Sequence, residues 1–244
     1  MTEDRFEHVT LYRQHVAQLV ENRGDRAAAM REAIGHEFEA YGLMERDLVI
    51  ASGLPRDGLL VDVGCGSGRL AWPLSSCHDG GYIGTDIVPD LLDYARDLVE
   101  RPDWRFELVS GLTIPAGDGE ADMVCFFSVF THLLHEESYS YLQESKRVLR
   151  PGGKIVFSFM EFLVDEHWGV FESNLASIGA PHPLNQFMSR DGIEAWAGHL
   201  DLTIEHMYRG DIPYIPLNQP IEMENGQRYE ELGTFGQSVA VLSC

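Results

Sequence analysis

The sequence predicts an α/β fold: a mostly parallel sheet with helices on both faces, preceded by a helical amino-terminal extension. Three observations support this prediction. Short apolar runs alternate with helical stretches over residues 59–159, helical periodicity covers the first fifty residues, and the last two apolar runs have no helix between them. Strands that alternate with helices form right-handed βαβ units and a parallel sheet. Two strands joined without a helix pair antiparallel, so we expect the sheet to end in an antiparallel pair.

The composition is that of one folded domain. The chain has 244 residues, of which 44% are hydrophobic and 10% aromatic, enough for one substantial core but not for two full domains. Apolar residues are spread evenly along the chain, which excludes a disordered protein. No apolar run approaches the roughly 18 residues of a membrane-spanning helix. The first residues are acidic and lack the apolar segment of a secretory signal, so we expect a cytoplasmic protein with no membrane partner.

The chain is strongly acidic: 39 Asp and Glu residues against 18 Lys and Arg residues give a formal net charge of −21 at pH 7. Nucleic acid is a polyanion that proteins hold with clustered Lys and Arg, so this charge argues against a nucleic-acid partner. It favours neutral or cationic small molecules, although a soluble acidic surface is its more common meaning. The four cysteines have no CxxC or Cys/His spacing, so we expect neither a disulfide framework nor a metal site.

The first fifty residues predict three helices. Apolar residues recur at steps of three and four in two stretches. These residues are Phe6, Val9, Tyr12, Val16 and Leu19 in the first stretch, and Met30, Ile34, Phe38 and Tyr41 in the second. A third, short helix is expected over residues 43–51, and a cluster of turn residues at 54–58 ends this region.

The rest of the chain alternates strands and helices. Each expected strand is a short apolar run, typical of a strand buried on both faces. The expected strands cover residues 59–63, 82–86, 104–109, 122–127, 154–159, 202–208 and 238–242. The expected helices among them cover residues 89–99, 138–149 and 189–199. A long proline-containing stretch separates the last two strands.

A GxGxG motif at residues 64–68, with Asp62 just before it, is the most informative feature of the sequence. It follows the first expected strand of the sheet. Glycines at this place allow the backbone to approach a ligand closely, and the following helix offers free N–H groups. The dinucleotide fingerprint GxGxxG needs its third glycine where this chain has Arg69. The spacing therefore favours a ligand without a pyrophosphate.

Asp86 closes the second expected strand, about twenty residues after the glycine motif. In nucleotide-binding folds, a carboxylate at this place accepts hydrogen bonds from both hydroxyls of a ribose. Ile87 beside it offers an apolar surface for a purine. These residues predict that the carboxyl edge of the sheet holds a ligand with a ribose and a purine.

Residues 59–159 resemble a class I S-adenosylmethionine-dependent methyltransferase. Four motifs carry the resemblance in the family's order and spacing. They are the glycine motif at 61–68, Asp86 at the ribose-binding position, the acidic start of the fourth strand at 121–124, and the helix, turn and strand at 146–154. The resemblance implies a Rossmann-like sheet of seven strands whose last strand is antiparallel. It also implies S-adenosyl-L-methionine as the cofactor and methyl transfer as the activity.

Carried over position by position, the resemblance implies which residues contact the cofactor. The glycine loop would approach its methionine part, Asp86 would take the ribose hydroxyls and Ile87 would pack on the adenine. Many relatives have Gly-Asp after the third strand, whereas this chain has Ser110, whose hydroxyl or following amides would replace that acid. The expected cofactor-binding residues are Asp62, Gly64, Cys65, Gly66, Asp86, Ile87, Ser110, Gly111, Leu112, Phe127 and Ser128.

The amino-terminal extension adds Arg13 as a candidate partner for the carboxylate of the cofactor, because relatives with such an extension often fold it over the cofactor. The alternative is a solvated arginine on an exposed helix face. We expect a helical extension over residues 1–53 that covers the cofactor or substrate. The methyltransferase core would span 54–244, with insertions around 161–188 and 209–233 that shape the substrate pocket.

Methyl transfer from a sulfonium is an in-line displacement that needs alignment, exclusion of water and, for an alcohol or phenol, a base. His132 follows the fourth strand at the carboxyl edge and is the candidate base; the alternative is a structural histidine bonded to the adjoining loop. Glu161 follows the fifth strand at the same edge and is a second candidate, orienting a polar acceptor. We expect the acceptor to be an oxygen or nitrogen of a small molecule; its identity and the oligomeric state stay open.

Two other functions stay open at this point. A nicotinamide-dependent oxidoreductase shares the general fold, but Arg69 stands where its fingerprint needs a glycine. A non-catalytic S-adenosylmethionine-binding protein is compatible with the altered adenine corner at Ser110. The intact Asp62, glycine motif and Asp86 argue against both alternatives.

Overall fold

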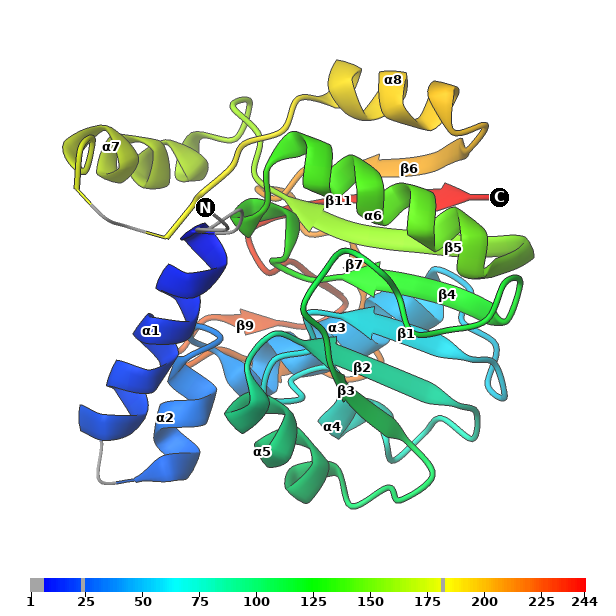
Figure 1. Cartoon of the computed structure of the whole chain (residues 1–244), viewed down its shortest axis with the longest axis horizontal. Coiled ribbons are helices and arrows are strands. Elements are labelled where there is room, and N and C mark those ends of the chain that lie inside the picture. The colour runs from blue at the N-terminus through cyan, green and yellow to red at the C-terminus, as the bar shows by residue number, and fades with distance from the viewer. Residues whose placement is uncertain (1–6, 23–24, 181–182) are drawn as a thin grey trace, which may run out of the picture.

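The structure is a computed structural model that describes residues 7–22, 25–180 and 183–244. A seven-stranded sheet forms its centre (Figure 1). The strands are β1 (Leu60–Val63), β2 (Tyr82–Asp86), β3 (Arg105–Leu108), β4 (Ala121–Phe126), β5 (Leu149–Phe159), β6 (Thr203–Tyr208) and β11 (Ser238–Ser243). Their order across the sheet is β3-β2-β1-β4-β5-β11-β6. The pairings from β3 to β5 are parallel, and β11 is antiparallel to both of its neighbours, so the predicted fold class is confirmed.

The strand order reverses between β1 and β4. The chain builds β1, β2 and β3 outward in one direction, and then returns to place β4 and β5 on the other side of β1. In open α/β sheets, ligands bind outside the carboxyl ends of the strands at such a reversal. The topology therefore places a binding site at the ends of β1 and β4.

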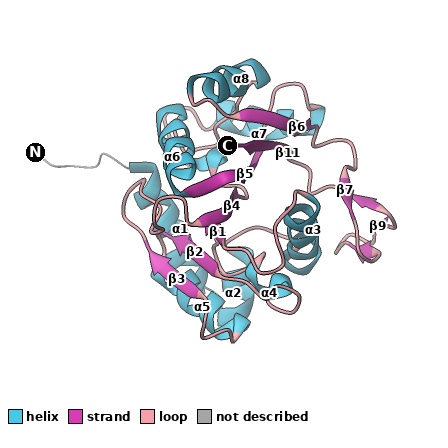
Figure 2. Cartoon of the chain, turned by 90° about the vertical axis from the view of Figure 1, so that its right-hand side faces the viewer, coloured by secondary structure: helices cyan, strands magenta, loops and turns pink. Residues whose placement is uncertain are grey.

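Helices cover both faces of the sheet (Figure 2). The helices of one face are α3 (Phe38–Ala51), α4 (Ala71–Leu74) and α5 (Pro89–Val99), and those of the other are α6 (His135–Val148) and α8 (Arg190–His199). Successive residues of a strand point to opposite faces. In β4, Met123 and Cys125 join the core under the first group of helices, and Val124 and Phe126 join the core under the second. The strands are thus buried on both sides, as their apolar runs predict.

The amino-terminal helices pack against the start of α5. α1 (Glu7–Asn22) and α2 (Arg26–Glu32) contribute Val16 and Met30 to a small apolar core that also contains Val88 and Leu91. Asp25 caps α2, because its side chain accepts hydrogen bonds from the first backbone N–H groups of that helix. These contacts hold the extension beside the carboxyl edge of the sheet.

The second predicted helix is divided between α2 and α3. Gly35 and Glu37, in the connection, have positive φ angles of 99° and 61°, which a helix does not accommodate. The separate short helix predicted over residues 43–51 is wrong, because those residues form the second half of α3.

Residues 209–233 form two small sheets that the sequence did not predict. β7 (Ile215–Pro216) pairs with β10 (Leu232–Gly233), and β8 (Ile221–Glu222) pairs with β9 (Arg228–Tyr229). Ile215, Ile221 and Met223 are buried in the same core as Met44 of α3. This segment is therefore packed onto the domain rather than a solvated loop.

α7 (Trp168–Ala176) follows β5 and the short helical turn η2 (Asp165–His167), and lies away from the sheet (Figure 1). Every residue of α7 is described, and none of them is buried. Within the described part of the chain, no helix is long and apolar enough to cross a lipid bilayer.

A substitution of Phe157, in the middle of β5, tests how much the core contributes to stability. Its side chain is fully buried, and its ring centroid lies 4.9 Å from that of Phe130. We expect Phe157→Ala to lower the free energy of unfolding by about 3–5 kcal/mol, because the lost ring leaves a cavity. The matched control Leu108→Ala changes an exposed residue of β3 and should alter that free energy by less than about 0.5 kcal/mol. Urea denaturation measures both, and equal effects would contradict this view of the core.

Candidate active site

A cavity of about 800 Å³ lies at the carboxyl ends of β1 to β5. The amino-terminal helices close it from the other side through residues such as Tyr12 and Ile34. Almost all of the predicted site residues line it. They are Arg13, Asp62, Gly64, Cys65, Gly66, Asp86, Ile87, Ser110, Gly111, Leu112, Phe127, Ser128 and His132. Glu161 is missing from the described residues that line the cavity.

The glycine loop has a backbone that favours glycine at each of its three positions. Gly64, Gly66 and Gly68 have positive φ angles of 73°, 54° and 87°. A Cβ atom at Gly64 would lie 2.5 Å from a methyl group of Val129, and one at Gly66 would lie 2.6 Å from a methyl group of Ile34. The loop therefore presents bare backbone to a narrow space that any larger residue would fill.

Asp86 joins the glycine loop to the end of β2. Its Oδ2 accepts a hydrogen bond from the N–H of Gly66 at 3.0 Å, and its Oδ1 accepts one from the N–H of Val88 at 2.8 Å. Burial raises the pKa of Asp86 to about 6. Because a carboxylate offers about four lone pairs, both oxygens still have capacity for the hydroxyls of a ribose.

Asp62 is held in the cavity wall from two sides. The hydroxyl of Tyr82 donates to its Oδ2 at 2.6 Å, and the thiol of Cys125 donates to its Oδ1 at 3.6 Å. Burial raises the pKa of Asp62 to about 7. These contacts fix the carboxylate directly before the glycine loop.

An ion pair between Arg69 and Glu45 lies beside the glycine loop, and both residues line the cavity. Arg69 Nη2 is 2.6 Å from Glu45 Oε1, and the two side chains are only 11% and 3% exposed. Arg69 Nη1 also donates to the carbonyl of Ile34 at 3.2 Å. The pair places a buried cation at the end of the site where the methionine part of the cofactor is expected. Its partners are 24 residues apart in the chain, and no local pattern signals the contact.

Arg13 lies at a different place from the one that its predicted role requires. Its Nε donates to the carbonyl of Ile87 at 3.0 Å, which anchors the side chain beside Asp86. That is the ribose and adenine end of the expected site, whereas the carboxylate of the cofactor belongs near the glycine loop. The geometry thus favours Arg69 over Arg13 as the partner of that carboxylate.

The segment expected to contact the adenine, residues 110–112, follows β3. The N–H of Val109 donates to the carbonyl of Asp86 at 3.0 Å, and the hydroxyl of Tyr141 donates to the carbonyl of Gly111 at 3.2 Å. Tyr141 comes from α6 and also lines the cavity. It fixes the segment from Ser110 to Leu112 that replaces the Gly-Asp of many relatives. Sequence patterns did not indicate Tyr141, because it lies 30 residues from its partner.

Ser128, just after β4, combines an unusual backbone with a closed set of hydrogen bonds. Its φ is 58°, a left-handed conformation that serine rarely adopts. Its N–H donates to Ser158 Oγ at 2.8 Å, Ser158 Oγ–H donates to Gln237 Oε1 at 2.7 Å, and Gln237 Nε2–H donates to Ser128 Oγ at 3.0 Å. Gln237 lines the cavity but is 109 residues from Ser128, so the sequence did not reveal it. Strained residues held by their surroundings cluster at functional sites.

His132 ends the helical turn η1 (Phe130–His132) and faces the cavity. Its Nδ1 lies 2.8 Å from the carbonyl oxygen of Leu184. Because a carbonyl only accepts, Nδ1 carries the proton and Nε2 is the basic nitrogen of the neutral ring. The centroid of the Tyr12 ring lies 5.7 Å from the centroid of the His132 ring, so α1 packs against the candidate base.

Glu161, the predicted group that orients the acceptor, is held by protein partners outside the cavity. Arg190 donates to both of its carboxylate oxygens, at 2.8 and 2.9 Å, and Ser238 donates to one of them. The residue is 1% exposed and joins β5 to α8 and β11. Its carboxylate is therefore occupied by protein partners outside the cavity.

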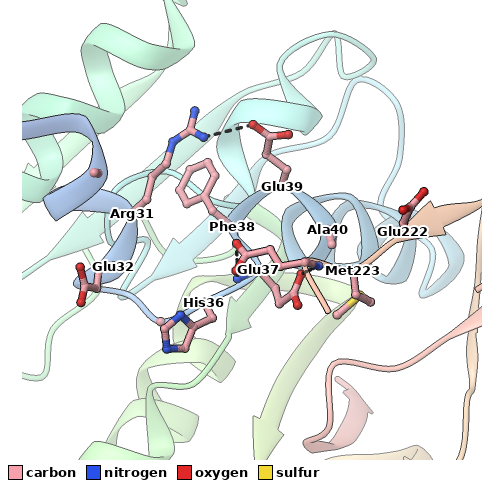
Figure 3. Close-up of a pocket in the computed structure, with 12 residues that line it drawn as sticks. Arg31, Glu32, His36, Glu37, Phe38, Glu39, Ala40, Glu222 and Met223 are labelled. Atoms are coloured by element: carbon pink, nitrogen blue, oxygen red, sulfur yellow. Dashed lines mark hydrogen bonds and ion pairs between the residues drawn. The ribbon is translucent and has the colours of Figure 1, made fainter. Parts of the chain in front are cut away.

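A second cavity, of about 540 Å³, lies beside the connection between α2 and α3 (Figure 3). Acidic side chains surround it. They are Glu32, Glu37, Glu39, Glu222 and Glu224. The N–H of Glu37 donates to the carboxylate of Glu224 at 3.3 Å, and the N–H of Glu224 donates to the carboxylate of Glu37 at 2.7 Å. These bonds tie the α2–α3 connection, which carries Ile34 over the glycine loop, to the segment after β8.

Comparison with known proteins agrees with this geometry. A family model described as a methyltransferase domain matches residues 61–157. The chain is 31% identical over 146 residues to the tRNA U34 carboxymethyltransferase of Methylococcus capsulatus, a match that covers 54% of this chain and 44% of that protein. It is 27% identical over 100 residues to the 27-O-demethylrifamycin SV methyltransferase of Amycolatopsis mediterranei, covering 39% of this chain and 36% of that protein. The chain thus spans less than half the length of these curated relatives.

A solved structure matches nearly the whole chain. It is the magnesium protoporphyrin IX methyltransferase of Synechocystis with bound SAH (S-adenosylhomocysteine). The TM-score is 0.59 at 12% identity, and the match covers 97% of this chain and 99% of that one. At this identity the likeness shows a shared fold.

Fold and site together resemble those of a class I S-adenosylmethionine-dependent methyltransferase domain. The segment 61–157 matches the methyltransferase-domain family, and S-adenosyl-L-methionine is the cofactor that this match implies. The residues present fit this cofactor: bare backbone at the glycine loop, a buried carboxylate at Asp86 and a cation at Arg69. One of the relatives is named for its action on tRNA, so the comparisons do not support the exclusion of nucleic acid that charge predicted.

The protonation of Asp86 makes cofactor binding depend on pH. The ionised carboxylate accepts hydrogen bonds from ribose hydroxyls, whereas the protonated form loses part of this capacity. Since the pKa of Asp86 is about 6, the affinity for S-adenosylhomocysteine should rise as the pH increases through that value and level off above it. Isothermal titration at a series of pH values between about 5 and 7.5 measures this dependence. An affinity that falls over this range would contradict the assignment.

Asp86→Asn tests the same carboxylate directly. The amide keeps only one accepting oxygen for two backbone N–H groups and the ribose, so we expect S-adenosylhomocysteine to bind at least about tenfold more weakly, ~1.4 kcal/mol. Asp97→Asn on the exposed side of α5 is the matched control and should bind like the original protein.

Variants of Ser128 test its strained backbone. Ser128→Ala and Ser128→Gly both remove the hydroxyl, but only glycine adopts a φ of 58° without strain. The glycine variant should therefore have a free energy of unfolding about 1 kcal/mol higher than the alanine variant. Urea denaturation of the two proteins measures the difference, and an alanine variant of equal stability would contradict the strain.

Proposed function

We propose that the protein transfers the methyl group of S-adenosyl-L-methionine to an oxygen or nitrogen of a small-molecule acceptor, with His132 as the base. One observation carries the proposal: a single cavity joins the glycine loop and Asp86 to the candidate base His132. When bound, the cofactor supplies an electrophilic methyl group on a sulfonium. Alignment of the acceptor with that methyl group is then the main task of the protein.

The residues of the cavity have separate tasks in this proposal. Asp86 would hold the ribose of the adenosyl part, the amides of the glycine loop would hold the methionine part, and Arg69 would donate hydrogen bonds to the cofactor's carboxylate. Tyr12 and Ile34, from the amino-terminal helices, would exclude water from the reacting centre. The residues expected to contact the cofactor at its reactive end are Phe127 and Ser128.

His132 would take the proton of the acceptor. The bond from Nδ1–H to the carbonyl of Leu184 orients the ring and leaves Nε2 as the basic atom. A base is needed for an alcohol or phenol, whereas a neutral amine can react without one. His132 would therefore be required as a base when the acceptor atom is an oxygen.

Two features speak against the alternative of a nicotinamide-dependent oxidoreductase. At Gly68 the glycine loop already approaches α5 closely, because a Cβ atom on this residue would lie 3.0 Å from the Cβ atom of Ala95. Arg69, at the place of the third fingerprint glycine, is engaged with Glu45. The relatives leave the acceptor class open, since one is named for a rifamycin and another for tRNA.

The test is a mass-spectrometric search for a gain of one methyl group when the protein and S-adenosylmethionine meet pooled metabolites. A methylated small molecule that forms only with both is the expected result. If total tRNA becomes methylated and no metabolite does, the proposed acceptor class is wrong.

Replacement of His132 tests its role once an acceptor is in hand. We expect His132→Ala to lower kcat about 100-fold for an oxygen acceptor, because proton removal is lost. The affinity for S-adenosylhomocysteine should stay within about twofold of the original. The matched control is His135→Ala, three residues further on, whose ring bonds to the carbonyl of Phe187 and should not affect kcat. A fall in both variants alike would argue for a structural role.

A further inference from the structure

We infer that the acceptor is an uncharged, largely apolar molecule that occupies the part of the cavity between the end of β5, α7 and the segment before β11. This inference rests on the proposed function and specifies its substrate class.

The topology leaves this part of the cavity for the acceptor. The residues expected to hold the cofactor follow β1, β2 and β3, at one side of the strand-order reversal. Met160 follows β5, Val170 belongs to α7 and Phe235 precedes β11, and all three line the same cavity. Ser128 and His132 follow β4, between the two groups. An acceptor on the β5 side would therefore meet the cofactor beside the candidate base.

The wall on this side is uncharged. Among the described residues that line the cavity, those beyond Tyr141 in the chain carry no formal charge. They are Met160, Val170, Pro183, Asn185, Phe235 and Gln237. The charged lining residues all precede Tyr141 in the chain, and the last of them is Glu137 at the start of α6. A buried charge without a partner costs several kcal/mol. An anionic or cationic acceptor would thus be disfavoured on this side.

α7 extends the apolar wall to the protein surface. Asn174 and Asn185 anchor it through two hydrogen bonds, at 3.1 and 3.0 Å. Phe171 packs with the rings of Phe162 and Phe187, whose centroids lie 5.6 and 5.8 Å away. Val170 is one turn before Asn174, so the two lie on the same face of α7, and Val170 lines the cavity. A helix with no buried residue that still contributes the apolar side chain of Val170 to the cavity is suited to cover an apolar ligand.

The polar groups of this region are neutral hydrogen-bonding groups. The hydroxyl oxygen of Ser128 accepts a hydrogen bond from the side-chain amide of Gln237, so the hydroxyl proton of Ser128 points away from that amide. Both residues line the cavity, and so does His132. This set matches a molecule with a hydroxyl on an apolar body. The net charge of −21 further disfavours a polyanion such as tRNA.

Two fluorescent probes that differ by one sulfonate test the inference. N-phenyl-1-naphthylamine is neutral, and 8-anilino-1-naphthalenesulfonate has nearly the same aromatic body with a negative charge. Each is titrated into the protein with saturating S-adenosylhomocysteine, which fills the cofactor part of the cavity. We expect saturable binding of the neutral probe, at least about tenfold tighter than that of the sulfonate.

Two variants of α7 test whether the neutral probe binds beside this helix. Val170→Arg places a charge on the face toward the cavity and should weaken binding of the neutral probe at least about tenfold. Leu175→Arg is the matched control, because Leu175 is on α7 but 51% exposed and does not line the cavity; it should change binding by less than about twofold. S-adenosylhomocysteine should bind both variants like the original protein.

The outcomes separate this inference from the proposed function. Equal or tighter binding of the sulfonate, or equal effects of the two variants, would overturn the inference while leaving the methyltransferase proposal intact. Displacement of the neutral probe by total tRNA would also overturn it, in favour of a nucleic-acid acceptor. Failure of the original protein to bind S-adenosylhomocysteine would contradict the proposed function itself.

Discussion

The carboxylate of Asp86 is the contact on which the site depends. It accepts the N–H of Gly66 from the loop after β1 and the N–H of Val88 from the loop after β2. One buried acid thus sets the relative position of the two loops that are expected to hold the two halves of the cofactor. Burial raises its pKa to about 6, so the carboxylate is ionised in neutral solution and can accept further hydrogen bonds.

The features that predict this site in the sequence are local. β2 and α5 begin and end where the patterns predict, since an apolar strand, an acid and a proline at the first helical turn follow one another within a few residues. The glycine loop is equally local, because the positive φ angles at residues 64, 66 and 68 favour glycine. The parallel core sheet follows from such units by simple rules of connection.

Contacts between distant segments could not be predicted in this way. Gln237 meets Ser128 and Ser158 only because β11 inserts beside β5, and Arg69 meets Glu45 only because α3 packs beside the glycine loop. The ion pair of Glu161 is equally distant in sequence, because its partner Arg190 is 29 residues away. The connection between α2 and α3 was missed because a left-handed glutamate, Glu37, leaves no sequence signal.

The most direct test of the account is a crystal structure of the protein grown with S-adenosylhomocysteine. We expect the ligand in the cavity of about 800 Å³, with its ribose hydroxyls within about 3 Å of the Asp86 carboxylate and its amino-acid end against the glycine loop. A ligand bound elsewhere, or a ribose turned away from Asp86, would contradict the central claim.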